Sequence, residues 1–273
     1  MRLELRLNGG VDEQISVEGR SIRFCLYGPP DGVPVISQNG TPSTRFRRRD
    51  QIDVMHQSGV RVLLSDRPGY GGSTRQPGRA VADVVHDVEM LANSQGWDAF
   101  TVFGGSGGGP HALACAALLP HRVTRCAVLS GIRPQRVTLP TEKNLRGQLT
   151  RLGADILAQV QAGGPEYPGA PLGPPAWEDP AARARLTATF ADSIDGWYDD
   201  KVAFARPWGF DLGSICVPVA VSFGSHDENV PATDAQWLLE RIPNAVGHQY
   251  AGGHLPSSLT MCDVYRWLSA PLG

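Results

Sequence analysis

The sequence predicts an α/β domain with a mostly parallel, eight-stranded sheet, helices on both faces of the sheet and a helical cap insertion. Three observations lead to this prediction. Short apolar segments alternate with longer segments of helical periodicity, as in βαβ units. Turns rich in glycine and proline separate them. The alternation stops at residue 131 and resumes at residue 214, so we expect a core of residues 1–130 and 214–273 around a cap of residues 131–213.

The first part of the core contains most of the predicted strands. Apolar or alternating runs predict strands at 3–7, 15–17, 21–27, 33–37, 61–65, 100–103 and 125–130. Apolar residues at helical spacing predict helices at 47–58, from 81 to just before Gly96, and at 111–119. Because strands joined through helices lie parallel, these segments predict a sheet covered on both faces.

The second part of the chain begins with the cap and ends with the rest of the core. Helices are expected in the cap at 142–161, 179–191 and 194–204, around a stretch at 163–175 that is too rich in glycine and proline for regular structure. The core then resumes with a strand at 217–223, a helix at 232–241, a strand at 246–250 and a helix at 256–268. We expect the cap to cover the carboxyl ends of the strands.

Charge and composition exclude several partners. The net charge is −2 and the isoelectric point is near 6.4, which gives no general attraction to nucleic acid or anionic membranes. The basic run Arg45–Arg49 is interpreted as a solvated helix face. No apolar run approaches the ~18–20 residues of a membrane helix, and the alternating N-terminus does not resemble a signal peptide.

Cysteine usage indicates the compartment. The five cysteines are scattered, include no CxxC pair, and are interpreted as buried free thiols in a reducing environment. We therefore expect a cytoplasmic monomer or homodimer that acts on a small-molecule substrate. No metal and no organic cofactor are expected.

The strongest chemical signal is Gly104-x-Ser106-x-Gly108, between a predicted strand and a predicted helix. A serine on such a sharp turn is strained and exposed, and the close approach of strand and helix requires small neighbours. The helix N-terminus adds backbone N–H groups for a developing oxyanion. The alternatives are a plain glycine-rich turn or a phosphate-binding loop, although the segment has no G-x-x-x-x-G-K-[ST] and no nearby lysine.

A serine hydroxyl needs a base, and seven histidines are available. His254 follows the last predicted strand and therefore belongs to the same sheet edge as Ser106. His248 lies within that strand and is interpreted as structural. His111, one turn into the helix after Ser106, is interpreted as a packing residue.

The acid that orients the base should come from another loop at this edge. Asp227 lies in the loop 224–231, after a strand and before a helix, and it gives the chain order Ser…Asp…His. Glu228 is the alternative acid. Asp227 could instead cap the following helix, a role that Asn229 could also take.

The loop 38–42 is the candidate for the oxyanion hole. Gly40 allows a turn that would direct the Thr41 N–H toward the pocket, beside the N–H of Gly107; a simple turn is the alternative. Asn39, Trp197 and Trp208 are the candidates for substrate contacts. The cap aromatics suit an apolar pocket wall or the packing of the cap on the core: Trp177, Phe190, Trp197, Tyr198, Phe204 and Trp208.

Taken together, these segments resemble the α/β-hydrolase superfamily, in particular its capped esterases, lactonases and proline-iminopeptidase-like members. The resemblance rests on the segments 38–42, 66–73, 104–108, 224–231 and 253–254. It implies Ser106 as nucleophile, His254 as base, Asp227 as acid and the Thr41 and Gly107 amides as oxyanion donors. The chain departs from the family at Asn39, where histidine is usual, and at Gly107, where iminopeptidases often carry tryptophan.

The expected function is a serine hydrolase that cleaves a small to medium ester, thioester or lactone through an acyl-enzyme on Ser106. One alternative is an aminopeptidase or amidase, which needs carboxylates over the pocket to hold a substrate ammonium. The cap offers Glu142, Glu166, Glu178, Asp192, Asp195 and Asp199. Another alternative is a non-hydrolytic lyase or a ligand receptor, because one fold can host several functions.

Overall fold

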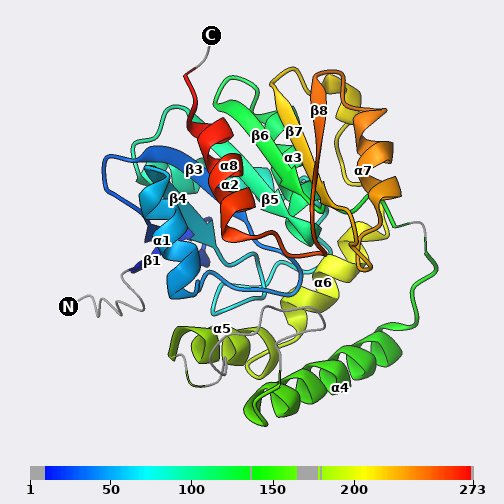
Figure 1. Cartoon of the computed structure of the whole chain (residues 1–273). Coiled ribbons are helices and arrows are strands. Elements are labelled where there is room, and N and C mark those ends of the chain that lie inside the picture. The colour runs from blue at the N-terminus through cyan, green and yellow to red at the C-terminus, as the bar shows by residue number, and fades with distance from the viewer. Residues whose placement is uncertain (1–9, 136, 165–177, 179, 272–273) are drawn as a thin grey trace.

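The computed structural model describes residues 10–135, 137–164, 178 and 180–271 (Figure 1). Within these residues, eight strands form one sheet in the order β1-β2-β4-β3-β5-β6-β7-β8. The predicted α/β class and eight-stranded sheet are confirmed. The predicted strand 3–7 lies outside the described residues. The strands are β1 (Val11–Val17), β2 (Arg20–Tyr27), β3 (Val33–Gln38), β4 (Val60–Ser65), β5 (Phe100–Gly105), β6 (Val123–Leu129), β7 (Val219–Gly224) and β8 (Ala245–Tyr250).

The sheet changes from antiparallel to parallel pairing at β4. Strands β1 and β2 form an antiparallel pair, and β2 also runs antiparallel to β4. From β4 to β8 every neighbouring pair is parallel. The register places Gln38 beside Gly104, and Gly104 beside Val128. The carboxyl ends of β3, β5 and β6 therefore meet at one edge, where the predicted site residues follow them.

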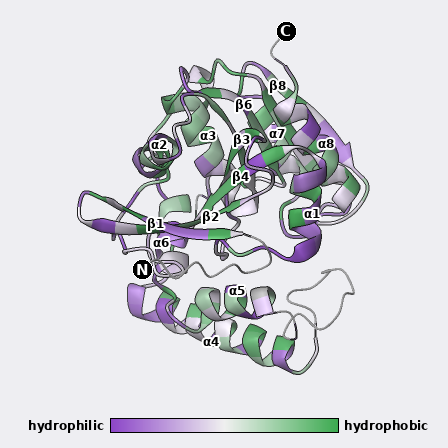
Figure 2. Ribbon diagram, turned by 90° about the vertical axis from the view of Figure 1, so that its left-hand side faces the viewer, coloured by the Kyte–Doolittle hydropathy of each residue, from purple (hydrophilic) through white to green (hydrophobic). Residues whose placement is uncertain are grey.

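Both faces of the sheet are buried. Alternate residues of one strand enter two different cores: Val35 of β3 packs with helices α1 (Arg49–Gln57) and α8 (Ser258–Ser269), whereas Ile36 packs on the opposite side. That second core includes α2 (Val84–Ser94), α3 (Gly109–Leu118) and α7 (Ala232–Leu239). Figure 2 shows the apolar colouring concentrated on the central strands and on α3. Burial on both sides explains why these strands read as continuous apolar runs.

In the described residues between β6 and β7, the α-helices are α4 (Glu142–Gln161), α5 (Pro180–Phe190) and α6 (Asp195–Phe204). In both views α4 and α5 lie side by side beyond one edge of the core, with α6 between them and the sheet (Figures 1 and 2). Trp197 of α6 packs with Leu145 and Leu149 of α4 and with Tyr70 of the core. None of the described helices is long and apolar enough to cross a bilayer. Trp177, Glu166 and most of the stretch 163–175 lie outside the described residues.

Among the helices that begin later than predicted, α2 and α8 have a side chain that accounts for the later start. The helix expected from residue 81 begins at Val84, since Asp83 accepts a hydrogen bond from the Ala80 N–H and holds the preceding turn. The last helix begins at Ser258 instead of residue 256, because Ser257 is its N-cap and accepts from the Thr260 N–H.

The interpretation of the run Arg45–Arg49 as a solvated helix face is wrong for Arg45. This side chain is buried, pairs with Asp66, and lies 2.8 Å from Asp12. It also donates to the Gly71 carbonyl at 2.8 Å. The guanidinium therefore fixes the loop 66–73 instead of facing water.

The cysteines match the expectation of buried thiols in part. All five are unpaired, and Cys25, Cys115 and Cys126 are buried. Burial raises the pKa of the Cys25 and Cys115 thiols to about 12, so both stay protonated at neutral pH. Cys216 is exposed, which corrects the expectation for that residue.

Candidate active site

Ser106 lies on a strained turn between β5 and α3. Its φ is +52°, a left-handed value that non-glycine residues rarely adopt, and Ser106 is the first residue of the short 3-10 turn Ser106–Gly108. A Cβ on Gly104 would lie 2.3 Å from the Gly108 carbonyl oxygen, and a Cβ on Gly108 would lie 2.2 Å from that of Gln38. Both glycines are therefore required by close backbone contacts.

Replacing Gly104 by alanine should disturb this turn. We expect a loss of about 1–3 kcal/mol or more in the free energy of unfolding, because the new methyl group meets backbone atoms that cannot rotate away. Activity should fall by roughly 100-fold, since a small shift of the nucleophile is costly. Thermal unfolding and ester kinetics measure the two effects.

Gly105→Ala is the matched control for Gly104→Ala. A Cβ on Gly105 would have its nearest neighbours at 3.9 Å, and the backbone φ of this residue is −100°. We expect near-normal stability and activity. Equal effects of the two substitutions would contradict the assignment of the damage to the Gly104 contact.

The predicted oxyanion loop lies against this turn. A Cβ on Gly40 would lie 3.7 Å from the Ser106 Cβ, and a Cβ on Gly107 would lie 2.6 Å from the Thr41 Oγ1. Gly107 also belongs to the first turn before α3, where backbone N–H groups lack partners within the helix. The structure thus brings Thr41, Gly107 and Ser106 together.

The loop after β7 and the loop after β8 meet at the same edge. The Nδ1 of His254 lies 2.9 Å from Asp227 Oδ2 and 3.1 Å from Oδ1. Asp227 Oδ1 also accepts from the N–H groups of Asn229 and Val230, both at 2.9 Å. Glu228 is exposed. With Nδ1–H donating to the carboxylate, Nε2 of His254 keeps a free lone pair that can accept a proton.

Asp227 is held in its ionised form. Burial raises the pKa of its carboxyl, but hydrogen bonds from the Val230 N–H, His254 and Ser130 outweigh burial and keep that pKa below its ordinary value. A permanent carboxylate at this position orients the imidazole and stabilises its protonated form.

Two residues that the sequence analysis did not consider support this arrangement. Ser130 is buried with φ +46°, and its Oγ lies 2.9 Å from the Tyr250 hydroxyl. The Tyr250 hydroxyl is also 3.1 Å from the Gly253 carbonyl and 3.3 Å from that of His254. Ser130 and Tyr250 are the last residues of the predicted strands 125–130 and 246–250, at the carboxyl edge of the sheet. This position was the signal that could have identified them.

The predicted nucleophile and the predicted base are not in hydrogen-bond contact. Although Ser106 and His254 are both described, no hydrogen bond joins the Ser106 hydroxyl to the His254 ring in the structure. Such contacts are often long before substrate binds and shorten in the substrate complex. The strained serine, the two loops and the oriented imidazole can together support nucleophilic attack on a carbonyl.

Comparison with known proteins identifies the family of this chain. The sequence model of the family described as alpha/beta hydrolase fold matches residues 34–258. The chain belongs to the alpha/beta hydrolase family. It is accordingly an enzyme of the hydrolase class, and the resemblance identified from the sequence is confirmed.

Relatives of this hydrolase have several activities. A non-heme chloroperoxidase of Streptomyces lividans is 28% identical over 86% of this chain and 89% of its own length. Among solved structures, an esterase, RhEst1, from Rhodococcus sp. ECU1013 has a TM-score of 0.68 at 20% identity, covering 97% of this chain and 99% of its own. An enol-lactonase from Burkholderia xenovorans LB400 has a TM-score of 0.69 at 18% identity, and the match covers 93% of this chain and 97% of the lactonase chain. At these identities, the two structures demonstrate the shared fold alone.

The three predicted substrate contacts of this hydrolase have packing partners. Asn39 donates to the Ser65 carbonyl at 2.8 Å and accepts from Arg47, so both ends of its amide are engaged. Trp197 is buried against Phe190 with a ring separation of 5.7 Å, and Trp208 stacks on Phe210 at 5.9 Å. A role in substrate binding stays a prediction for each of the three.

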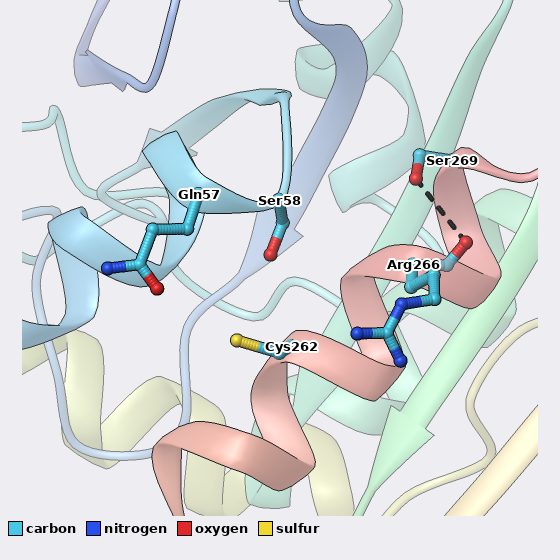
Figure 3. A pocket seen from close by; sticks show the side chains of 5 residues that line it. All are labelled: Gln57, Ser58, Cys262, Arg266 and Ser269. Atoms are coloured by element: carbon cyan, nitrogen blue, oxygen red, sulfur yellow. Dashed lines mark hydrogen bonds between the residues drawn. The ribbon is translucent and has the colours of Figure 1, made fainter.

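Two cavities of the described structure lie away from the predicted catalytic residues. Figure 3 shows one of about 300 Å³, where Gln57 and Ser58 of the α1 end face Cys262 and Arg266 of α8. Because α1 runs back from the carboxyl edge, this cavity lies toward the opposite edge of the sheet. The other, of about 670 Å³, is lined by residues 204–213, Pro134, Gln135, Trp237 and Arg241. Neither cavity is lined by Ser106, Asp227 or His254.

Proposed function

We propose that this enzyme is a serine hydrolase that cleaves a small to medium carboxylic ester, thioester or lactone through an acyl-enzyme on Ser106. The observation that carries the proposal is the pairing of His254 with Asp227 at the sheet edge where Ser106 lies on its strained turn. The Thr41 loop packed against the same turn supports it.

The proposed reaction has two steps. In the first, Ser106 Oγ attacks the carbonyl carbon while His254 Nε2 takes the hydroxyl proton, and the carbonyl oxygen becomes an oxyanion near the Thr41 and Gly107 amides. The intermediate collapses, and His254 returns the proton to the departing alcohol or thiol. In the second step His254 activates a water molecule, which attacks the acyl carbon and releases the acid and free Ser106.

Asp227 would act without exchanging a proton. Its carboxylate would accept from Nδ1–H throughout the cycle and stabilise the imidazolium that forms at each proton transfer. We also propose that residues 131–213 form a cap over the site, since α4, α5 and α6 lie in this segment beyond one edge of the core.

The cap carboxylates favour this proposal over an aminopeptidase. Asp195 lies 2.7 Å from Arg146, Glu142 lies 2.8 Å from the same guanidinium, and Asp199 lies 2.8 Å from Arg75. These three carboxylates are already paired with arginines and are poorly suited to hold a substrate ammonium. Glu178 and Asp192 are exposed, and Glu166 lies outside the described residues.

Labelling with a fluorophosphonate tests the proposal. We expect intact-mass spectrometry to find one phosphonyl adduct on the wild-type protein, since an activated serine attacks phosphorus as it attacks a carbonyl. The adduct should disappear in Ser106→Ala and form much more slowly in His254→Ala. Absence of any adduct on folded wild-type protein would contradict the proposal.

A substrate panel then separates the alternatives. Esters, thioesters and lactones should be turned over, whereas amino-acyl naphthylamides should be poor substrates. Faster cleavage of the naphthylamides would favour an aminopeptidase. Labelling of Ser106 without hydrolysis of any panel member would point to lyase chemistry on the same residues.

A further inference from the structure

The most densely bonded buried carboxylate in the described part of the chain belongs to Asp200 of α6, not to a triad residue. Asp200 is 0% exposed. It accepts hydrogen bonds from Thr41 Oγ1 at 2.5 Å and from the Tyr70 hydroxyl at 3.0 Å. Arg67 contacts it at 2.6 Å and Arg79 at 2.5 Å. A helix between β6 and β7 is therefore fastened to the predicted oxyanion loop.

The cluster holds more positive than negative charge. Arg67 is 3% exposed and Arg79 is 4% exposed, so two buried guanidiniums surround one carboxylate. Burial raises the pKa of the Asp200 carboxyl, but the charges of Arg67 and Arg79 outweigh burial and hold that pKa well below its usual range. With all three groups ionised, one net positive charge stays behind the loop. Charges act strongly on neighbouring groups where water is excluded.

His111 does not change this balance. Burial, followed by the charge of Arg67, lowers the pKa of its imidazole to about 3, so the ring is neutral. Its Nδ1 lies 2.9 Å from the Gly107 carbonyl and must carry the proton of that hydrogen bond. His111 thus supports the turn after Ser106, in agreement with its interpretation as a packing residue.

Arg67 connects the carboxylate to the loop backbone. One terminal nitrogen donates to the Asn39 carbonyl, and the other donates to Thr41 Oγ1 at 2.8 Å and lies 3.3 Å from the Gly40 carbonyl. The Gly40 carbonyl and the Thr41 N–H are the two ends of one peptide group. A cation on the carbonyl end polarises the group and strengthens its N–H as a donor. Within the described residues, no hydrogen bond occupies that N–H.

We propose that Asp200 is a positioning residue that holds Arg67 against the Gly40–Thr41 peptide, so that the loop is fixed and its N–H is polarised toward the oxyanion. The inference rests on the proposed function. Asp200 would not touch the substrate and would act through Arg67 and Thr41. Because the oxyanion exists only in the tetrahedral state, the effect should fall on the transition state and spare substrate binding.

Asp200→Asn is the variant to test. It keeps the size of the side chain but removes the charge that orients Arg67. We expect kcat for the best ester to fall by about 10- to 100-fold, with KM changed by less than about threefold. The affinity for a boronic acid, which forms a tetrahedral anionic adduct on the serine, should fall in parallel with kcat/KM.

Asp199→Asn provides the matched control. Asp199 is the neighbouring residue on α6, is 3% exposed, and pairs with Arg75 instead of the oxyanion loop. It should lower the melting temperature and leave kcat and boronate affinity unchanged, as a purely structural ion pair would. If Asp200→Asn behaves in the same way when assayed well below its melting temperature, the inference is overturned.

Thr41→Val keeps the test decisive if Asp200→Asn does not fold. It removes the hydroxyl that bonds both Asp200 and Arg67 and retains the backbone N–H. A smaller parallel loss of kcat and boronate affinity, about 10-fold, is expected, and unchanged values would overturn the inference. A wild-type protein that neither hydrolyses esters nor binds the boronate would instead refute the proposed function, and the inference with it.

Discussion

Alanine at position 106 should lower kcat for an activated ester by roughly 10⁴- to 10⁶-fold, the largest effect expected for any single substitution in this chain. The reason is chemical, because no neighbouring group can replace the alkoxide that attacks the carbonyl. In free energy the loss is about 5–8 kcal/mol of transition-state stabilisation. Stability should change little, since the exchange removes one oxygen and leaves the backbone turn in place.

The companion measurement is the double variant Ser106→Ala/His254→Ala. Residues that act as one unit give non-additive losses, so the double variant should be about as slow as Ser106→Ala alone. Steady-state kinetics with an activated ester, on protein checked for folding by circular dichroism, provides both values. Retention of more than about a tenth of wild-type kcat in Ser106→Ala would rule out the acyl-enzyme on this residue.

Asp227→Asn should lower kcat by about 10⁴-fold with little change in KM. An amide in this position can donate to Nδ1 of His254, which would place the ring proton on Nε2 and leave no lone pair to accept from Ser106. The two backbone N–H groups that now bond Asp227 Oδ1 can still bond the amide oxygen, so the loop should keep its shape. Kinetics and a crystal structure of the variant would test both statements.

Glu228→Gln is the control for this substitution. Glu228 is adjacent, carries the same charge, and is exposed, so we expect activity within a few-fold of the wild type. A larger loss in Glu228→Gln than in Asp227→Asn would reverse the assignment of the acid.

The pH dependence follows from the lowered pKa of Asp227. Its carboxyl has a lower pKa in the folded protein than in the unfolded chain, so its contribution to stability is fully present above about pH 3.9. That contribution is lost as the pH falls through the folded pKa. Asp227→Asn should therefore flatten the acid limb of the stability curve, as measured by chemical denaturation between about pH 2 and pH 5. Because the pKa of Asp227 is lowered, protonation of this carboxylate should not limit the activity of the wild-type enzyme at neutral pH.

The fold and the candidate triad were accessible from the sequence because their signals are local. Glycine and proline punctuate the elements, and the carboxyl end of each strand can be placed from the apolar run that precedes it. Ser106 follows the end of β5 directly, and Asp227 and His254 lie three and four residues beyond the ends of β7 and β8. The parallel sheet then brings the three loops to one edge without further information.

The buried charged residues around the site could not be predicted from the sequence, because their burial depends on contacts between distant segments. Asp199 and Asp200 are neighbours on α6, and nothing in the local sequence separates the one that pairs with Arg75 from the one that pairs with Arg67 and Arg79. Arg45 was misassigned for the same reason, since its partners Asp12 and Asp66 are 33 and 21 residues away.

The attachment of α6 also bears on protein engineering by segment exchange. Its Gly196 N–H donates to the Gly69 carbonyl at 3.1 Å, and a Cβ on Gly196 would lie 2.3 Å from the Tyr70 ring. A chimera that replaced all of residues 131–213 would remove the anion between two buried guanidiniums and leave them to repel each other. Exchange of residues 141–193 alone would keep the Asp200 carboxylate between the two guanidiniums. For laboratory evolution of substrate range, α4 and α5 are therefore the helices to exchange, and α6 should be retained with the core.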